Sequence, residues 1–227
     1  MGLFDKLRGN KKPKENKKTS KVDNNVSKVD DKPSNVYKGY DLSASQDDKI
    51  NMVNKISDES LLVEIFEREP NSTVRGLIIV KIKEDKNLAS LFYLRKPNQR
   101  DSDSNKIISK VSDELILTEM LCYTEIEYGL HDYYQKLNPD LLMLVGDFAP
   151  NSMNRSAASK VRSEMVGKEA PFDENVIIDA INHFNNKQSL INVKDRAHSR
   201  CPPFSKIDDN AIYDKIEKTA EERINQI

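Results

Sequence analysis

The stretch ISDESLLVEIFEREPNSTVRGLIIVKI, residues 56–82, carries the pattern that decides the fold. Apolar side chains in its first half recur with helical spacing, at Leu61, Leu62 and Ile65. This spacing places them on one face of a helix. Ser57 or Asp58 stands just before that helix and can accept hydrogen bonds from its first free backbone N–H groups. The stretch therefore predicts a capped, amphipathic helix.

A connector of the form Pro-Asn-Ser-x-x-Arg follows this helix and occurs twice in the chain. It lies in EPNSTVRG, residues 69–76, and in APNSMNRS, residues 149–156. Proline cannot sit inside a helix and marks where the first helix stops. The Asn-Ser that comes next can cap a second helix. The chain therefore repeats a unit made of helix, connector and helix.

The pattern of the first helix returns, with degeneracy, along most of the chain. The copies start at Ile56, Ile82, Val111, Leu137, Phe172 and Ile207. Successive starts are 26 to 35 residues apart. A repeat of this length with two helices is typical of an α-solenoid, in which stacked pairs share one core. We therefore expect an all-α, right-handed solenoid of five or six antiparallel helix pairs.

These lines resemble the short bacterial and archaeal kind of HEAT-like repeats, over roughly residues 50–227. Lines such as acid-x-x-Leu-Leu-x-x-Ile, Asp-Pro-x-x-x-Val-Arg and Ala-Val-x-x-Ile recur in that family, and residues 56–82 match them most clearly. The resemblance weakens at CYTEIEYGLHDYYQ, residues 122–135, which reads as an extra helix or an extended loop. It weakens again at residues 193–204, where two prolines end any helix. The resemblance implies a superhelix of stacked pairs.

The chain ahead of the repeats is polar and basic. Residues 9–48 contain few apolar side chains and cannot bury enough area to offset their ordering entropy, so we predict a disordered linker there and a repeat domain at 49–227. Residues 1–21 carry about six net positive charges, and the rest of the chain about seven negative ones. The tail is thus expected to be a solvated tether, or to contact anionic lipid or nucleic acid weakly and unspecifically.

Residues 1–8 form a separate, amphipathic start. Leu3, Phe4 and Leu7 fall on one face of a short helix, with Asp5 near its beginning. This segment can dock on a partner or a membrane surface, and the alternative is a frayed chain end, because so short a helix is marginal alone.

The composition excludes several classes of protein. The 227 residues include only seven glycines, too few for the tight turns of an all-β fold, and 32% charged residues. The two cysteines are far apart and suggest ordinary thiols in a reducing interior. No apolar run approaches the roughly 20 residues that span a bilayer, and no signal-peptide pattern is present. We therefore expect a cytoplasmic protein without a transmembrane segment.

Two sets of side chains are candidates for binding a partner. Arg75 and Arg155 lie in the first turn after each connector and either recognise an acidic ligand or pair with a neighbouring acid such as Asp58 or Asp140. A second set is rich in aromatic and acidic residues and lies in the irregular middle of the chain. Its members are Glu125, Glu127, Tyr128, His131, Tyr133 and Tyr134. They form either an exposed binding patch or the core of an additional helix.

The remaining polar motifs do not build a catalytic or metal site. His198 and Cys201 form a His-x-x-Cys pair, but zinc needs two more ligands and His131, His183 and Cys122 are scattered. No motif supports Cys201 as a nucleophile, and no cofactor is expected. Recurrent carboxylates at helix starts indicate capping rather than acid–base chemistry. They are Asp58, Glu84, Asp113, Glu174 and Asp209.

The sequence therefore favours a non-catalytic protein-binding scaffold with no specific nucleic-acid partner. The partner would be a segment of another protein that lies across parallel helices. Two alternatives stay open. One is an enzyme or enzyme accessory, because the HEAT-like resemblance extends to chromophore lyases and base-excision glycosylases. The other is a module that docks on membranes or nucleic acid through its tail.

Overall fold

The computed structural model describes residues 36–37, 39–95, 102–123, 131–167, 170–199 and 210–227, all within one compact unit formed by residues 35–227. The amphipathic start with Leu3, Phe4 and Leu7 lies outside the described residues, as do Tyr128, Cys201 and Asp209. None of the helices in these ranges combines the length and the apolar character that crossing a bilayer requires.

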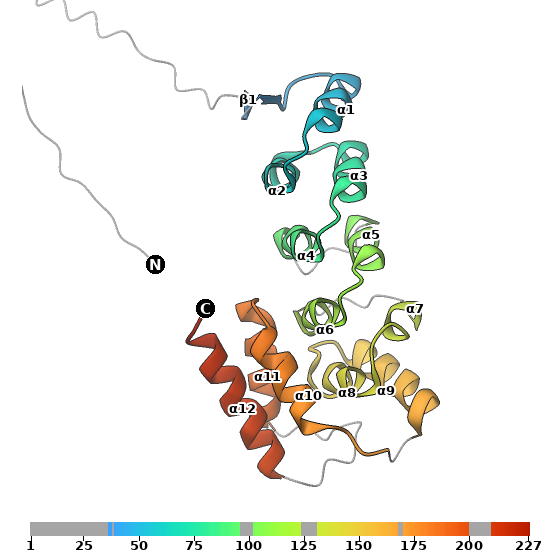
Figure 1. Ribbon diagram of the computed structural model, residues 1–227, viewed down its shortest axis with the longest axis vertical. Helices are drawn as coiled ribbons and strands as arrows, with labels where there is room; N and C mark the ends of the chain where they lie inside the picture. The colour runs from blue at the N-terminus through green and yellow to red at the C-terminus, as the bar shows by residue number, and fades with distance from the viewer. Residues whose placement is uncertain (1–35, 38, 96–101, 124–130, 168–169, 200–209) are drawn as a thin grey trace, which may run out of the picture. The chain divides into compact units, whose positions relative to one another are not determined.

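Within these ranges the unit is all-α, as predicted, and begins with one small strand pair (Figure 1). The helices are α1 (Gln46–Lys55), α2 (Glu59–Arg68), α3 (Ser72–Lys81), α4 (Asp85–Leu94), α5 (Ser102–Lys110), α6 (Glu114–Tyr123), α7 (His131–Tyr134), α8 (Pro139–Phe148), α9 (Ser152–Val166), α10 (Glu174–His183), α11 (Lys187–Ser199) and α12 (Asn210–Ile224). The strands β1 (Val36–Tyr37) and β2 (Tyr40–Asp41) pair antiparallel.

The six predicted copies are the even helices, α2, α4, α6, α8, α10 and α12, and each begins two or three residues after the predicted start. Each even helix packs on the next along the chain. Their inward residues are buried, including Leu62, Ile177 and Ile212, and they belong to one core. The antiparallel helix pairs therefore stack as expected.

The helix caps mostly follow the sequence pattern. Asp58 and Asp113 each accept hydrogen bonds from the two backbone N–H groups that open their helix. Two predicted caps are wrong. Glu84 precedes α4 but makes no side-chain cap, because its carboxylate pairs with Lys86 instead. Asp173, one residue earlier than Glu174, caps α10.

The connectors are built as predicted. Asn71 accepts from the N–H groups of Thr73 and Val74 at the start of α3, with donor–acceptor distances of 2.9 and 3.2 Å. Asn151 does the same at the start of α9. The odd helices α3 and α9 therefore begin directly after the proline and reverse the chain direction. α1, α3 and α5 stack on one another, and α7 contacts α9.

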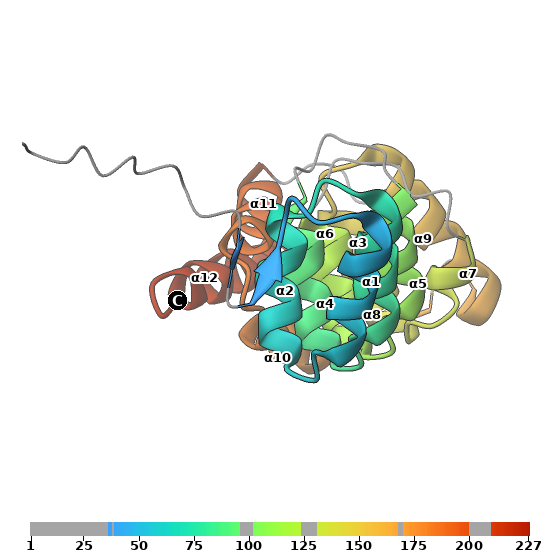
Figure 2. The ribbon, with the colours of Figure 1, turned by 90° about the horizontal axis from the view of Figure 1, so that it is seen from above.

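One odd helix leaves this arrangement. α11 packs mainly on α6, α8 and α12 rather than on α9. Viewed along the stack, α1, α3 and α5 lie on one side of α2, α4 and α6, whereas α11 and α12 lie on the other (Figure 2). The last part of the chain therefore folds back over the even helices.

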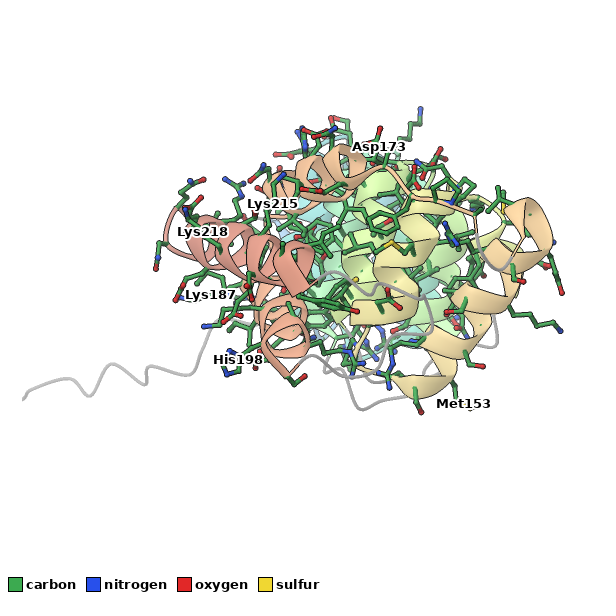
Figure 3. All side chains as sticks on the ribbon, turned by 90° about the horizontal axis from the view of Figure 1, so that it is seen from below. Met153, Asp173, Lys187, His198, Lys215 and Lys218 are labelled. Carbon is green, nitrogen blue, oxygen red and sulfur yellow. The ribbon has the colours of Figure 1, made fainter. Side chains whose placement is uncertain are left out.

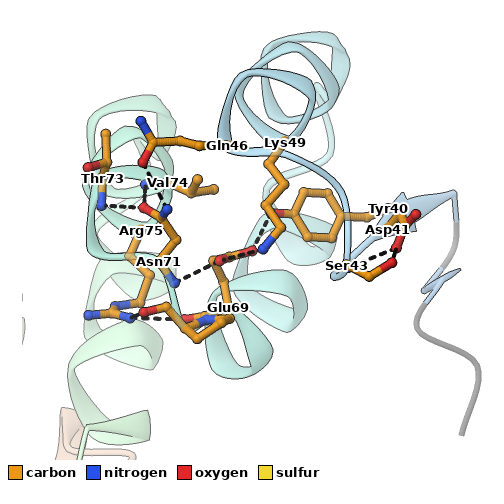
Figure 4. A network of polar contacts seen from close by, with 11 residues as sticks. Tyr40, Asp41, Ser43, Gln46, Lys49, Glu69, Asn71, Thr73, Val74 and Arg75 are labelled. Carbon is orange, nitrogen blue, oxygen red and sulfur yellow. Dashed lines mark hydrogen bonds and ion pairs between the residues drawn. The ribbon is translucent and has the colours of Figure 1, made fainter.

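The two ends of the unit are closed differently. At the first end Tyr40 buries its ring and donates its hydroxyl to Glu69, which also pairs with Lys49 (Figure 4). The ordered structure of the unit thus begins before the predicted domain boundary at residue 49, because the buried ring of Tyr40 holds this segment in place. At the other end the exposed side chains are mostly polar, including Lys187, Lys215 and Lys218 (Figure 3). Polar outer faces are typical of the terminal units of repeat proteins.

Candidate functional site on the outer face of the even helices

The candidate site is the face of the even helices that points away from the odd helices. We define this outer face by the sixth, ninth and tenth residue of each even helix. In α2 these are Glu64, Glu67 and Arg68; in α4 Ser90, Tyr93 and Leu94; in α6 Glu119, Cys122 and Tyr123; and in α8 Leu144, Asp147 and Phe148. The positions are partly or fully exposed in α2 and α4 but mostly buried in α6 and α8. Part of this face is therefore covered.

The cover on α6 is the first half of α11. The Glu119 carboxylate accepts the backbone N–H groups of Asn185 and Asn186, the two residues directly before α11. Three residues further on, the Ser189 hydroxyl donates to the Glu119 carbonyl at 3.0 Å. The Asn192 side chain donates to the carbonyls of Cys122 and Tyr123, at 2.8 and 3.1 Å. Since the last carbonyls of a helix have no partner within it, Asn192 satisfies groups that α6 leaves open.

The second half of α11 covers α8. Arg196 lies four residues after Asn192, and its Nε donates to the Asp147 carbonyl at 2.8 Å. Eight of the ten α8 residues, Leu141 to Phe148, are buried. α11 therefore crosses two successive even helices and places one polar donor over the last turn of each.

Glu119 sits in an unusual electrostatic setting. Burial raises the pKa of its carboxyl, although the N–H groups of Asn186 and Asn185, the Tyr93 hydroxyl and the Arg223 charge act in the opposite direction. Burial, and then the Glu119 charge, raise the pKa values of Tyr93 and Cys122. A buried carboxylate that receives two N–H groups is a strong anchor for a helix N-terminus, where the helix dipole is positive.

The uncovered part of the outer face lies on α2 and α4. Leu94 is 40% exposed there. The Tyr93 ring packs edge-on against Tyr123, with centroids 4.9 Å apart, beside the start of α11. The Arg95 guanidinium lies over the Phe66 ring at 5.9 Å and links α4 to α2. This surface thus adjoins the part that α11 covers.

Carboxylates hold successive even helices in register. The Glu59 carboxylate in α2 accepts the N–H groups of Lys83 and Glu84, at 3.0 and 3.2 Å, just before α4. Asp85 in α4 repeats this contact just before α6, with the N–H groups of Ser112 and Asp113. Glu114 and Asp140 continue the series with the N–H groups of Asn138 and Asp173. The outer face is therefore presented by helices whose spacing is fixed.

The predicted arginines lie elsewhere, at the starts of α3 and α9. Arg75 donates to the carbonyls of Glu69 and Pro70, at 3.0 and 2.7 Å, and pairs with Asp103 of α5 at 2.7 Å. Its acid is thus Asp103 and not the predicted Asp58. Arg155 donates to the equivalent carbonyls, those of Ala149 and Pro150. Both side chains brace the connector that precedes their helix.

The aromatic set is divided. Tyr134 is fully buried in α7 and belongs to the core, which agrees with the second of the two predicted alternatives, the core of an additional helix, and not with an exposed binding patch. Tyr133 is half-buried, and Lys136 lies over its ring at 5.5 Å. Among the polar motifs, His198 faces Glu217 at 2.9 Å on the surface. Within the described ranges, no three His, Cys, Asp or Glu side chains gather as metal ligands would.

Sequence reasoning missed the contacts of α11. Glu119 stands inside the apolar run LILTEMLC, residues 115–122, and Ser189 and Asn192 flank apolar residues in the same way. A polar residue inside such a run is a signal for a buried hydrogen bond.

No protein-family model matches the chain, and comparisons with curated proteins and with solved structures found no match either.

Proposed function

We propose that residues 39–227 form a HEAT-like, non-catalytic scaffold that binds another protein on the outer faces of α2 and α4. The observation that carries this proposal is the contrast along one face of the stack. The outer positions of α6 and α8 are buried beneath α11, whereas those of α2 and α4 remain accessible. The packing of α11 on α6 and α8 supports the proposal that the same face of α2 and α4 binds polypeptide.

Two properties suit the α2–α4 face to binding. Its two helices are held in register by Glu59, and by Arg95 over Phe66, so binding orders little that was mobile before. It also offers a half-buried Tyr93 and an exposed Leu94 among polar neighbours. An aromatic or apolar anchor with a polar rim is the usual composition of a protein-binding surface.

A comparison of two charge substitutions tests the proposal. Leu94→Glu places a charge on the outer face, and Val80→Glu places one on α3, where Val80 is 70% exposed. Tagged wild-type protein and both variants are used to capture proteins from the native cell, after circular dichroism has shown equal helix content. We expect a protein that the wild type and Val80→Glu retain and that Leu94→Glu loses. The same captured set for all three proteins would refute the α2–α4 face as the binding surface.

A further inference from the structure

We propose that the partner's bound segment is an α-helix that crosses α2 and α4 as α11 crosses α6 and α8, with its N-terminus over α2. This inference rests on the proposed function and specifies the partner. The geometry points to it because α2 and α4 repeat the arrangement of α6 and α8 at the outer positions.

The first correspondence is a glutamate. Glu119 is the sixth residue of α6 and receives the N–H groups of Asn185 and Asn186, the two residues directly before α11. Glu64 is the sixth residue of α2, and it is partly exposed at the surface. The earlier helix of each adjacent pair thus carries a carboxylate at the same position. A carboxylate there favours a helix N-terminus, because the dipole and the unpaired N–H groups of that end attract negative charge.

The second correspondence sets the direction of the bound helix. α11 begins over α6 and ends over α8, and α2 and α4 follow each other in the same order. α2 adds a second exposed acid, Glu67, beside the exposed Arg68, whereas the outer positions of α4 carry no charged residue. The net negative charge therefore lies at the α2 end, which favours the same polarity as that of α11.

The third correspondence is the set of carbonyls at the helix ends. On α11, Asn192 and Arg196 lie four residues apart and reach the last turns of α6 and α8. The equivalent carbonyls of α2 and α4 belong to Glu67, Arg68 and Tyr93. Residues four apart lie on one helix face, so a partner helix with two donors at this spacing can reach both last turns. Leu94 would then lie against the apolar residues of the same face.

The experiment uses the full chain with a photoreactive side chain on the outer face. Leu94→p-benzoylphenylalanine is irradiated in native extract beside the control Val80→p-benzoylphenylalanine. The segment joined only through position 94 is sequenced and made as a peptide. We expect this peptide to become helical when it binds, as measured by circular dichroism. A spin label at its N-terminus should broaden backbone amide signals of α2 more than those of α4.

Substitutions complete the test. Glu64→Gln keeps the size of the side chain and should weaken peptide binding about two- to fivefold, since it removes one charge near a helix N-terminus. Removing either donor from the peptide should weaken binding roughly three- to tenfold. A peptide that binds in extended form, or with reversed polarity, overturns the inference and leaves the scaffold intact. A chain that captures no protein through Leu94 overturns the proposed function, and this inference with it.

Discussion

At the scale of single residues, the two connectors differ in the residue before proline. Glu69 and Ala149 are both buried, at 3% and 0% exposure, in otherwise matching sequence. Ala149 lies inside the stack, where it packs in the core. Glu69 lies at its first end, where it accepts from Tyr40, Lys49 and the N–H of Asn71. One side chain thus adapts a repeated connector to closing the stack (Figure 4).

Glu69→Ala should therefore destabilise the protein although alanine is the residue of the second connector. It leaves the Tyr40 hydroxyl and the Lys49 ammonium buried without their acceptor. We expect the free energy of unfolding to fall by roughly 2–4 kcal/mol, measured by urea denaturation. Glu67→Ala, an exposed position of the same helix, should change it by less than about 0.5 kcal/mol. Equal losses in the two variants would mean that Tyr40 and Lys49 do not depend on Glu69.

Glu119 should make stability depend on pH. Its pKa is raised by burial, so the folded state holds the proton more tightly than the unfolded chain does. The free energy of unfolding therefore decreases as the pH rises from below the ordinary value of 4.5 through the raised pKa. Tyr93 and Cys122, which face it, do not titrate in this range, because burial raises their pKa values as well.

Glu119→Gln is the matched test, because glutamine can still accept the N–H groups of Asn185 and Asn186 but does not titrate. Urea denaturation of both proteins between about pH 4 and pH 8 isolates the contribution of this carboxyl. We expect the difference in unfolding free energy to move in favour of the glutamine variant as the pH rises. Parallel profiles for the two proteins would show that the carboxyl keeps its ordinary pKa.

At the scale of helices, lysines join successive odd helices at their C-terminal ends. Lys81 of α3 donates to the carbonyls of Val53 and Asn54 in the last turn of α1, both at 2.9 Å. Lys110 of α5 donates in the same way to carbonyls at the C-terminal end of α3. Lys136, which follows α7, reaches α5. A cation at a helix C-terminus satisfies open carbonyls and complements the dipole, so each lysine fastens one helix pair to the one before it.

Lys110→Met tests this series. Methionine keeps most of the apolar stem but removes the donors to the carbonyls of Ile79, Val80 and Ile82. We expect a loss of about 1–3 kcal/mol in unfolding free energy, because bonds from a charged donor to partly buried acceptors are lost. The control is Lys106→Met in the same helix, whose exposed ammonium makes a long ion pair with Asp103 at 3.9 Å, so its loss should be below about 1 kcal/mol. Similar losses for both would argue against the fastening role.

The sequence predicted the helices better than the contacts that these helices make with distant parts of the chain. The even helices and both connectors could be found because spacing, caps and proline are local signals, as at Asp58 and Asn71. The position of α11 could not be found in this way, because the hydrogen bond from the Asn186 N–H to Glu119 joins residues that are 67 apart in the sequence. The periodicity of apolar residues indicates which side of a helix is apolar, but it does not indicate which other helix will cover that side. The binding face follows from that covering, so it too appears only in the structure.

At the scale of the whole unit, stability should not be uniform. In a simple stack each helix pair contacts only the pairs next to it, so local unfolding begins at the two ends of the stack. α11 departs from this rule because it joins α6, α8 and α12. α8 lies at the centre of these contacts, whereas α1 packs mainly on α3 and β2 within the part of the chain that the structure describes. The region from α6 to α12 should therefore open as one unit, separate from the first three helices.

Hydrogen exchange of the full chain measures this division. We expect the slowest exchange in α6 and α8 and faster exchange toward α1, because α1 lies at the end of the stack and packs on fewer helices. Asn192→Ala removes the donor to the carbonyls of Cys122 and Tyr123 and should lower the opening free energy of α6 and α11 by about 1 kcal/mol. Exchange in α1 and α3 should stay unchanged, since neither helix packs closely on α11 within the described ranges. The control Asn182→Ala, at an exposed position of α10, should alter neither region. If Asn192→Ala accelerates exchange equally in every helix, the unit opens as a whole and α11 does not divide it.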